Sequence, residues 1–205
     1  MEKKIKLVCP ECNKEFNTDI YTSINVQLDK DMKTKILSGK LFEIECEHCH
    51  AKFHIPYPVL YHDMEKKLLI QYTEEKDLES SKDVLKNANV DADYTVRIVD
   101  NERDWIEKIL ISDSGLDDRI MELYKLLVLS QYEDADNVNG LYYWNIQTLE
   151  NPHYVMVLDE KESDKMHFMP FHEGVYKQVE EVFLSDIQQD YVVDASWAVS
   201  NTKVI

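Results

Sequence analysis

The chain has 205 residues with an apolar fraction of 44%, which suffices for one large globular domain or for two smaller ones. Only four glycines and five prolines are present, so the composition excludes fibrous and disordered chains. A formal charge of −17 argues against nucleic acid as a ligand, because binding to nucleic acid begins with cationic contacts to phosphates.

The N-terminal part is distinguished by its cysteines, which all fall into Cys-x-x-Cys pairs, Cys9 with Cys12 and Cys46 with Cys49. Two such pairs form a zinc-binding pattern, since each two-residue loop can turn both sulfurs toward one ion. Phe16 and Phe53 each follow the second cysteine of a pair by four positions. This repetition predicts two similar knuckles, each running into a short strand, related by a pseudo-twofold axis around the metal.

Two other uses of cysteine pairs fit this sequence less well. Disulfides need an oxidising compartment, to which nothing in the sequence points. A redox Cys-x-x-Cys normally opens a helix after a buried strand, and neither pair has that context. Four thiolates leave no open coordination position, so the pattern predicts one structural zinc ion held by the four cysteines.

Three histidines lie close to the second pair, at His48, His50 and His54. His50 and its counterpart Asn13 follow the last cysteine of each knuckle, where a positive φ is common, and both residue types tolerate that conformation. We interpret His50 as a turn residue, and His48 and His54 as exposed or neighbouring groups. A second metal bound by these three histidines remains an alternative.

Between and after the knuckles, the sequence predicts one helix and two strands. Residues 28–40 (LDKDMKTKILSGK) indicate a short helix that ends at Gly39. Residues 41–46 (LFEIEC) and 66–72 (KKLLIQY) are typical of strands.

Three of these features occur together in one known family: a Cys-Pro-x-Cys opening, a Leu-x-Gly-x-x-Phe turn at residues 37–42, and PVLYHD at residues 58–63. In them the chain resembles the CpXC family of prokaryotic proteins, and residues 97–127 are similar to the family's C-terminal helical part. The likeness covers roughly residues 5–130. The second pair lacks the proline, and neither pair is followed by glycine. The resemblance implies a fold and a zinc ion but no reaction.

The predicted fold class is α+β, with an N-terminal zinc ribbon followed by an antiparallel sheet covered by amphipathic helices. We expect a ribbon region over residues 1–72, a polar linker over 73–93 and an α+β region over 94–205. Whether residues 136–205 form a separate domain stays open.

The third region begins with the strand 94–100, which is followed by two helices. The first carries an apolar stripe of Trp105, Ile106, Ile109 and Leu110. The second is expected to start with Ser114 as N-cap, and the carboxylates of Asp117 and Asp118 are interpreted as helix-capping acids. Its predicted buried face holds Leu116, Ile120, Leu123, Tyr124, Leu127 and Val128.

The last third predicts three strands, at residues 141–149, 153–159 and 165–171, and then a helix over 173–189. The buried face of that helix is expected to carry Val175, Val179, Val182, Phe183 and Ile187. Tyr142, Tyr143, Trp144 and Tyr154 could line a ligand groove or a partner surface. Strand alternation places half of these aromatic side chains in the core.

The best catalytic candidate is His62 beside Asp63, as a base with its orienting group. Adjacent residues of an extended segment point to opposite faces, so the favoured interpretation is structural. The chain is therefore not predicted to be an enzyme, although an enzyme using His62 and Asp63 stays an alternative.

The function predicted is that of a zinc protein whose structural ribbon shapes a protein-interaction or assembly module, with a protein partner or self-association. A nucleic-acid-binding ribbon is the alternative: residues 1–56 hold nine acidic and nine basic residues, and Lys3, Lys4, Lys6, Lys14 and Lys52 could cluster there. Residues 57–205, with 31 acidic and 14 basic residues, oppose it. No apolar run is long enough to span a membrane or to form a signal peptide, so we expect a cytoplasmic protein without a membrane partner.

Overall fold

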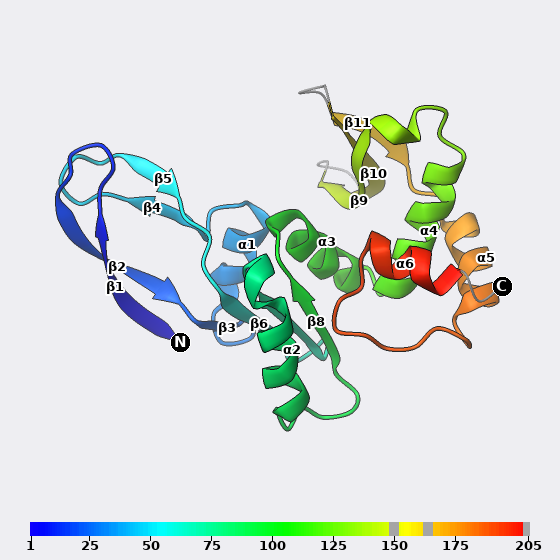
Figure 1. Cartoon of the computed structure of the whole chain (residues 1–205), viewed down its shortest axis with the longest axis horizontal. Coiled ribbons are helices and arrows are strands. Elements are labelled where there is room, and N and C mark those ends of the chain that lie inside the picture. The colour runs from blue at the N-terminus through cyan, green and yellow to red at the C-terminus, as the bar shows by residue number, and fades with distance from the viewer. Residues whose placement is uncertain (148–151, 162–165, 203–205) are drawn as a thin grey trace. The chain divides into compact units, whose positions relative to one another are not determined.

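The computed structural model describes residues 1–147, 152–161 and 166–202 (Figure 1). The chain divides into two compact units, residues 1–105 and 106–205. Helices and several sheets are both present, and the four cysteines cluster in the N-terminal part. The predicted α+β class with a cysteine-bearing N-terminal region is thus confirmed.

The first unit begins with two antiparallel strand pairs, one for each cysteine pair. Strand β1 (Glu2–Val8) pairs with β2 (Glu15–Tyr21), and β4 (Glu43–Glu45) pairs with β5 (Lys52–His54). In the first pair Leu7 lies opposite Phe16, and in the second Ile44 lies opposite Phe53. Each cysteine pair therefore occupies the turn of a hairpin, as the repeated sequence pattern predicts.

A four-stranded sheet forms the rest of the first unit's β structure. Its order is β3 (Ser23–Asn25), β6 (Val59–Asp63), β7 (Leu68–Tyr72) and β8 (Thr95–Val99). Strands β6 and β7 form an antiparallel hairpin, whereas β3 with β6 and β7 with β8 are parallel. The antiparallel arrangement expected from the sequence thus holds only for the middle pair of this sheet.

Strand β8 was expected to open the region 94–205, but it joins the first unit through β7. Parallel neighbours require a crossover connection, because the chain must return to the same end of the sheet. Residues 73–93, predicted to be a polar linker, supply that crossover with the 3₁₀ helix η1 (Glu75–Asp77) and helix α2 (Leu78–Asn87).

Helix α1 (Lys30–Leu37) lies between β3 and β4 and ends as predicted. Gly39 has a φ of 69°, and its N–H donates to the carbonyl of Ile36 at 2.9 Å. The core of this unit contains Phe42 with Tyr57 and Tyr72, at ring-centroid distances of 4.8 and 5.1 Å. Trp105 lies 5.3 Å from Tyr72 and completes the aromatic cluster.

Helix α3 (Glu102–Asp113) spans the division between the units, which falls between Trp105 and Ile106. Its predicted apolar stripe is confirmed: Trp105, Ile106 and Ile109 are buried and Leu110 is half-buried. The periodicity did not reveal that Glu107 and Lys108, between these residues, are buried as well.

Helix α4 (Asp118–Ser130) starts three residues later than the predicted cap at Ser114 would place it. Its N-cap is Asp117, whose side chain accepts from the N–H of Arg119. The prediction for Ser114 is wrong because α3 continues to Asp113, and the Ser114 hydroxyl donates to the carbonyl of Leu110. Ile120, Leu123 and Tyr124 are buried as expected, whereas Leu127 is exposed.

The second unit contains an antiparallel sheet in the order β11–β10–β9, built from β9 (Val138–Gln147), β10 (Pro152–Glu160) and β11 (Met166–Pro170). A 3₁₀ turn, η2 (Ala135–Asn137), precedes it. Alternate sheet residues Leu141, Tyr143, Met156 and Leu158 enter a core shared with α3 and α4. The predicted antiparallel sheet under helices is therefore found in this unit.

The predicted helix over 173–189 is shorter in the structure, where α5 spans Glu173–Phe183. Val179 is buried, but Val182 is exposed. A final helix, α6 (Ala195–Thr202), was not predicted, and it packs with α5 against α4. Of the aromatic residues singled out, Tyr143 is buried and Tyr142 and Trp144 are half-buried, whereas the side chain of Tyr154 lies outside the described residues.

Candidate metal centre

The two cysteine knuckles have the same backbone hydrogen bonds. In the first, the N–H of Asn13 donates to the carbonyl of Cys9 at 2.9 Å, and the N–H of Cys9 donates to the carbonyl of Lys14 at 3.0 Å. In the second, His50 donates to Cys46 and Cys46 donates to Ala51, each at 2.9 Å. The internal repeat in the sequence therefore corresponds to a repeat in three dimensions.

Both knuckles close through a residue in the left-handed conformation, as predicted. Asn13 has a φ of 55° and His50 a φ of 59°. This region is costly for most residues with a Cβ, and asparagine and histidine are among those that enter it more readily. Within the second knuckle, the N–H of His48 donates to Cys46 Sγ at 3.4 Å.

The four sulfur atoms form two close pairs, and each pair joins one cysteine of the first knuckle to one of the second. Cys9 Sγ lies 3.6 Å from Cys49 Sγ, and Cys12 Sγ lies 3.8 Å from Cys46 Sγ. All four lie within 4.8 Å of one another. For a tetrahedral ion with metal–sulfur bonds of about 2.3 Å, adjacent sulfurs are separated by about 3.8 Å. The donor set thus has the dimensions of a four-coordinate site.

A small apolar core includes two of the cysteines. Cys9 and Cys46 are fully buried, together with Phe16 and Ile44. The rings of Phe16 and Phe53 meet edge to face with centroids 6.0 Å apart. The two phenylalanines that mark the sequence repeat therefore contact each other beneath the cysteines.

The acidity of the thiols differs within the cluster. Backbone N–H groups, that of Cys12 foremost, lower the pKa of Cys9 to about 7. Burial opposes ionisation of Cys46, but N–H groups of His48 and Cys49 outweigh it and lower the pKa of Cys46. For Cys49 the N–H of Ala51 acts in the same direction, yet burial and the other three sulfurs raise its pKa to about 12.

This order of acidity follows burial, backbone N–H donors and the contacts among the four sulfurs. The first thiol to ionise is stabilised by N–H donors, and each later one must form beside an existing negative charge. Full ionisation of the cluster therefore calls for a compensating cation at its centre.

The three histidines near the second knuckle point to three different partners. The ring of His48 lies 3.0 Å from the carbonyl oxygen of Glu15, and that of His50 lies 2.9 Å from a carboxylate oxygen of Glu45. His54 contacts Glu102. Within the described part of the chain, the cysteines are the group of ligand-type side chains that converges.

The lysines considered for nucleic-acid binding are spread over the hairpins. Lys6 forms an ion pair with Glu15 at 2.5 Å, and Lys52 forms one with Glu43 at 2.9 Å. Lys3 and Lys4 are adjacent on β1 and so lie on opposite faces of the strand. Two of the five lysines are thus paired with glutamates, and Lys3 lies on the other face of β1 from Lys4 and Lys6.

His62 and Asp63 lie apart, on opposite faces of β6. His62 Nε2 is 3.1 Å from the hydroxyl of Tyr94. Asp63 is buried and accepts from Gln27 Nε2 at 2.8 Å and from the N–H of Lys66 at 3.0 Å. Burial disfavours its ionised form, but these donors and Lys33 lower its pKa. Asp63 therefore fixes the β6–β7 turn against the segment before α1.

Asp63 also lines an open hollow of about 490 Å³. The other lining residues are Val26, Gln27, Lys30, Lys33, Glu65 and Lys66. His62 is not among them, so the two residues of the catalytic candidate do not share this hollow.

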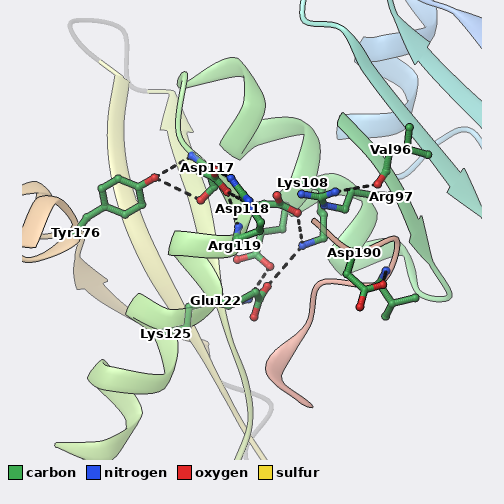
Figure 2. A network of polar contacts seen from close by, with 12 residues as sticks. Val96, Arg97, Lys108, Asp117, Asp118, Arg119, Glu122, Lys125, Tyr176 and Asp190 are labelled. Atoms are coloured by element: carbon green, nitrogen blue, oxygen red, sulfur yellow. Dashed lines mark hydrogen bonds and ion pairs between the residues drawn. The ribbon is translucent and has the colours of Figure 1, made fainter. Parts of the chain in front are cut away.

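Five charged side chains lie buried between α3 and α4, namely Glu107, Lys108, Asp118, Glu122 and Lys125, and all of these but Glu107 are labelled in Figure 2. The sequence analysis singled out Asp118 alone of the five, as a helix-capping acid. Lys125 Nζ lies 2.9 Å from Glu107 and 2.8 Å from Glu122. Lys108 Nζ lies 3.0 Å from Asp118 and 3.7 Å from Glu122. The sequence signal available was the helical spacing of Asp118, Glu122 and Lys125, which places all three on one side of α4.

Glu107 is the member of this network that contacts the sheet. One of its carboxylate oxygens accepts from the backbone N–H of Tyr143 in β9 at 2.6 Å. Burial raises the pKa of Glu107 to about 7, against the opposing effect of Lys125. The network thus joins α3, α4 and the edge of the second unit's sheet.

Comparison with known proteins agrees with the cysteine geometry. A protein-family model, described as CpXC protein, matches residues 7–125. No curated protein and no solved structure matched the chain. Of the helices in the described ranges, none combines the length and apolar character needed to cross a bilayer.

Proposed function

This chain belongs to the CpXC family, and on that basis we propose that Cys9, Cys12, Cys46 and Cys49 bind one structural zinc ion. The ribbon formed in this way supports a protein-interaction or assembly module. The observation that carries the proposal is the pair of sulfur–sulfur distances, 3.6 and 3.8 Å, across two matching knuckles.

Zinc is the metal that best fits this donor set. Four thiolates in tetrahedral arrangement suit Zn²⁺ or an iron–sulfur centre, and zinc knuckles with two-residue loops commonly take Zn²⁺. Bound zinc would balance the negative charge of the four thiolates and so favour ionisation of Cys49, whose pKa is raised by burial and by the other three sulfurs. All four positions would be filled by protein, which favours a structural role over a catalytic one. Free thiols of this kind fit a reducing compartment such as the cytoplasm.

A protein partner is favoured over nucleic acid by the distribution of charge. Residues 106–205 hold nineteen acidic and seven basic residues, and two of the ribbon's lysines are paired with glutamates. The acidic excess of residues 106–205 would repel a phosphate backbone. The lysines of the ribbon that are not paired with glutamates would attract it only weakly. Weak or absent binding of DNA and RNA, measured by fluorescence anisotropy at low ionic strength, is the expected result.

The metal content of the natively purified full chain tests the zinc proposal. Elemental mass spectrometry is expected to give one zinc per chain, and Cys46→Ser should lose it, because one ligand is removed from the buried side of the site. His50→Asn is the matched control: it changes an exposed residue of the same knuckle to the type found at Asn13, and it should keep the zinc.

Three outcomes would contradict the proposal. These are iron in place of zinc, two metals per chain, or an unchanged zinc content in Cys46→Ser. The second outcome would return attention to His48, His50 and His54 as ligands.

A further inference from the structure

The sheet of the second unit has two edge strands, and one of them is closed by a side chain. At the β9 edge, the N–H of Tyr143 donates to the buried carboxylate of Glu107 at 2.6 Å. Lys125 holds that carboxylate at 2.9 Å. Because Glu107 takes the place of a neighbouring strand's carbonyl, β9 is not available for pairing at this point.

The other edge of the sheet is formed by β11. In the part of the chain that the structure describes, β11 is paired with β10 alone. Met166 is 55% exposed and Phe168 59% exposed, although both are large apolar side chains. Edge strands in natural proteins usually carry charges, bulges or prolines that prevent pairing. The sequence MHFMP has no lysine or acid, His167 lies 3.3 Å from Glu160, and Pro170 at the end of the strand is its residue of the blocking type.

The register extends this apolar surface across the sheet. Phe168 lies opposite Val157, and Val157 lies opposite Tyr142 on β9. Directly opposed residues share a face, so these three form a row on the side away from Leu141, Tyr143 and Met156, which enter the core. Phe168 is the exposed member of this row, since Val157 is only 6% exposed and Tyr142 is half-buried.

The charge of the second unit indicates what could cover this edge. Residues 106–205 include nineteen acidic residues and seven basic ones. Of the basic residues, Lys108 and Lys125 are buried among carboxylates, and Arg119 is paired with Asp117. Asp159, opposite Met166, adds a carboxylate next to the edge. A second copy of this chain would bring the same negative charge to the contact, and a cationic segment would be attracted.

We propose that the edge of β11, with Met166 and Phe168, binds an extended segment of a partner protein in which basic residues alternate with apolar ones. The segment adds a fourth strand through main-chain hydrogen bonds, and its apolar side chains contact Met166 and Phe168. Pro170 has no N–H and ends the pairing. This inference rests on the proposed role in protein interaction and specifies the surface and the chemistry of the partner.

Synthetic peptides and the zinc-loaded full chain provide the test. The probes are labelled eight-residue peptides in which lysine alternates with valine, isoleucine or phenylalanine. Two control peptides are matched to each lysine peptide. One has glutamate in place of lysine, and the other has N-methyl groups on the amides along one edge of the extended peptide. In fluorescence anisotropy at low salt, we expect at least one lysine peptide to bind, and both matched probes to bind at least about 10-fold more weakly.

Variants of the chain locate the site. Phe168→Ser and Met166→Ser should each weaken binding by about 10-fold, roughly 1.4 kcal/mol. Val182→Ser is the control, because Val182 is equally exposed, at 61%, but lies on α5. It should leave binding unchanged. Thermal unfolding and zinc content should stay unchanged in all three variants, since the side chains are exposed.

Several results would overturn the inference. One is that no lysine peptide binds at concentrations up to about 1 mM. Another is that the N-methylated peptide binds as tightly as the unmodified one. A third is that Phe168→Ser binds the lysine peptide as tightly as the unchanged chain. A β11-mediated dimer, detected by light scattering and lost in Phe168→Ser, would assign the edge to a second copy instead. None of these results would affect the zinc stoichiometry, so failure here is distinguishable from failure of the zinc proposal.

Discussion

Asn13 and His50 show how a single backbone angle shapes the candidate metal centre. Both have a φ between 55° and 59°, and both follow the second cysteine of a knuckle. The conformation lets the N–H of each residue reach back to the first cysteine's carbonyl at 2.9 Å. The side chain of His50 makes an exposed contact with Glu45, which contributes little by comparison.

Replacing His50 therefore tests the backbone rather than the imidazole. His50→Val should destabilise the zinc-loaded protein by about 1–2 kcal/mol, because a β-branched residue fits the left-handed region poorly. His50→Asn should change the free energy of unfolding by less than about 0.5 kcal/mol. Chemical denaturation at saturating zinc measures both. Equal losses in the two variants would assign the effect to the contact with Glu45.

At the level of elements, α3 and α4 are joined by charges as well as by apolar contacts. Two lysines and three carboxylates lie buried between them, with Glu107 also bound to β9. A buried ion pair is weak evidence for stability, because desolvation offsets much of the attraction. Here the carboxylate of Glu107 satisfies a main-chain donor at a sheet edge, which gives the buried charge a specific structural role.

This arrangement makes stability depend on pH in a defined direction. The pKa of Glu107 is raised from 4.5 to about 7 by burial, so the folded state binds its proton more tightly than the unfolded state. Its contribution to the free energy of unfolding is therefore greatest below pH 4.5 and decreases as the pH rises from 4.5 to 7. In Glu107→Gln this decrease should disappear.

Denaturation curves of both proteins between pH 4.5 and 8, at saturating zinc, measure the difference. The zinc site titrates in both proteins alike, so its contribution cancels in the subtraction. Parallel pH profiles would show that Glu107 is already ionised across this range.

In the whole molecule, the cysteine-bearing hairpins have a much smaller core than the second unit. The core beneath the cysteines contains four buried residues, and two of these, Cys9 and Cys46, belong to the candidate metal centre. Among the described residues of the second unit, fifteen buried residues form one core, and none of these is a cysteine. The hairpins should therefore depend on the metal, whereas the second unit should not.

Removal of zinc by a strong chelator tests this division. Backbone amides of β1, β2, β4 and β5 should lose their protection from hydrogen exchange, because zinc binding supplies on the order of 10 kcal/mol to the folding of such small sites. Amides of α4, β9 and β10 should keep theirs. Exchange followed by mass spectrometry measures both sets, with metal-free Cys46→Ser as the reference. Loss of protection in α4 and β9 as well would show that the units unfold together.

The sequence by itself determined the features of this protein that depend on neighbouring residues. Cys-x-x-Cys spacing and residues that accept a positive φ are local properties, so the two knuckles, their pseudo-twofold relation and the end of α1 at Gly39 could be predicted. The apolar stripe of α3 and the three strands of the second unit followed from their periods of 3.6 and 2.

Only the tertiary structure decided which distant segments meet. The parallel pairing of β7 with β8, the burial of Glu107 and Lys108, and the exposure of Leu127 and Val182 depend on contacts between residues far apart in the chain. Local sequence patterns do not predict such contacts. The residues around a glutamate on an apolar helix face do not indicate whether its partner is water or a lysine eighteen residues away. The open edge of β11 and the closed edge of β9 are decided in the same way.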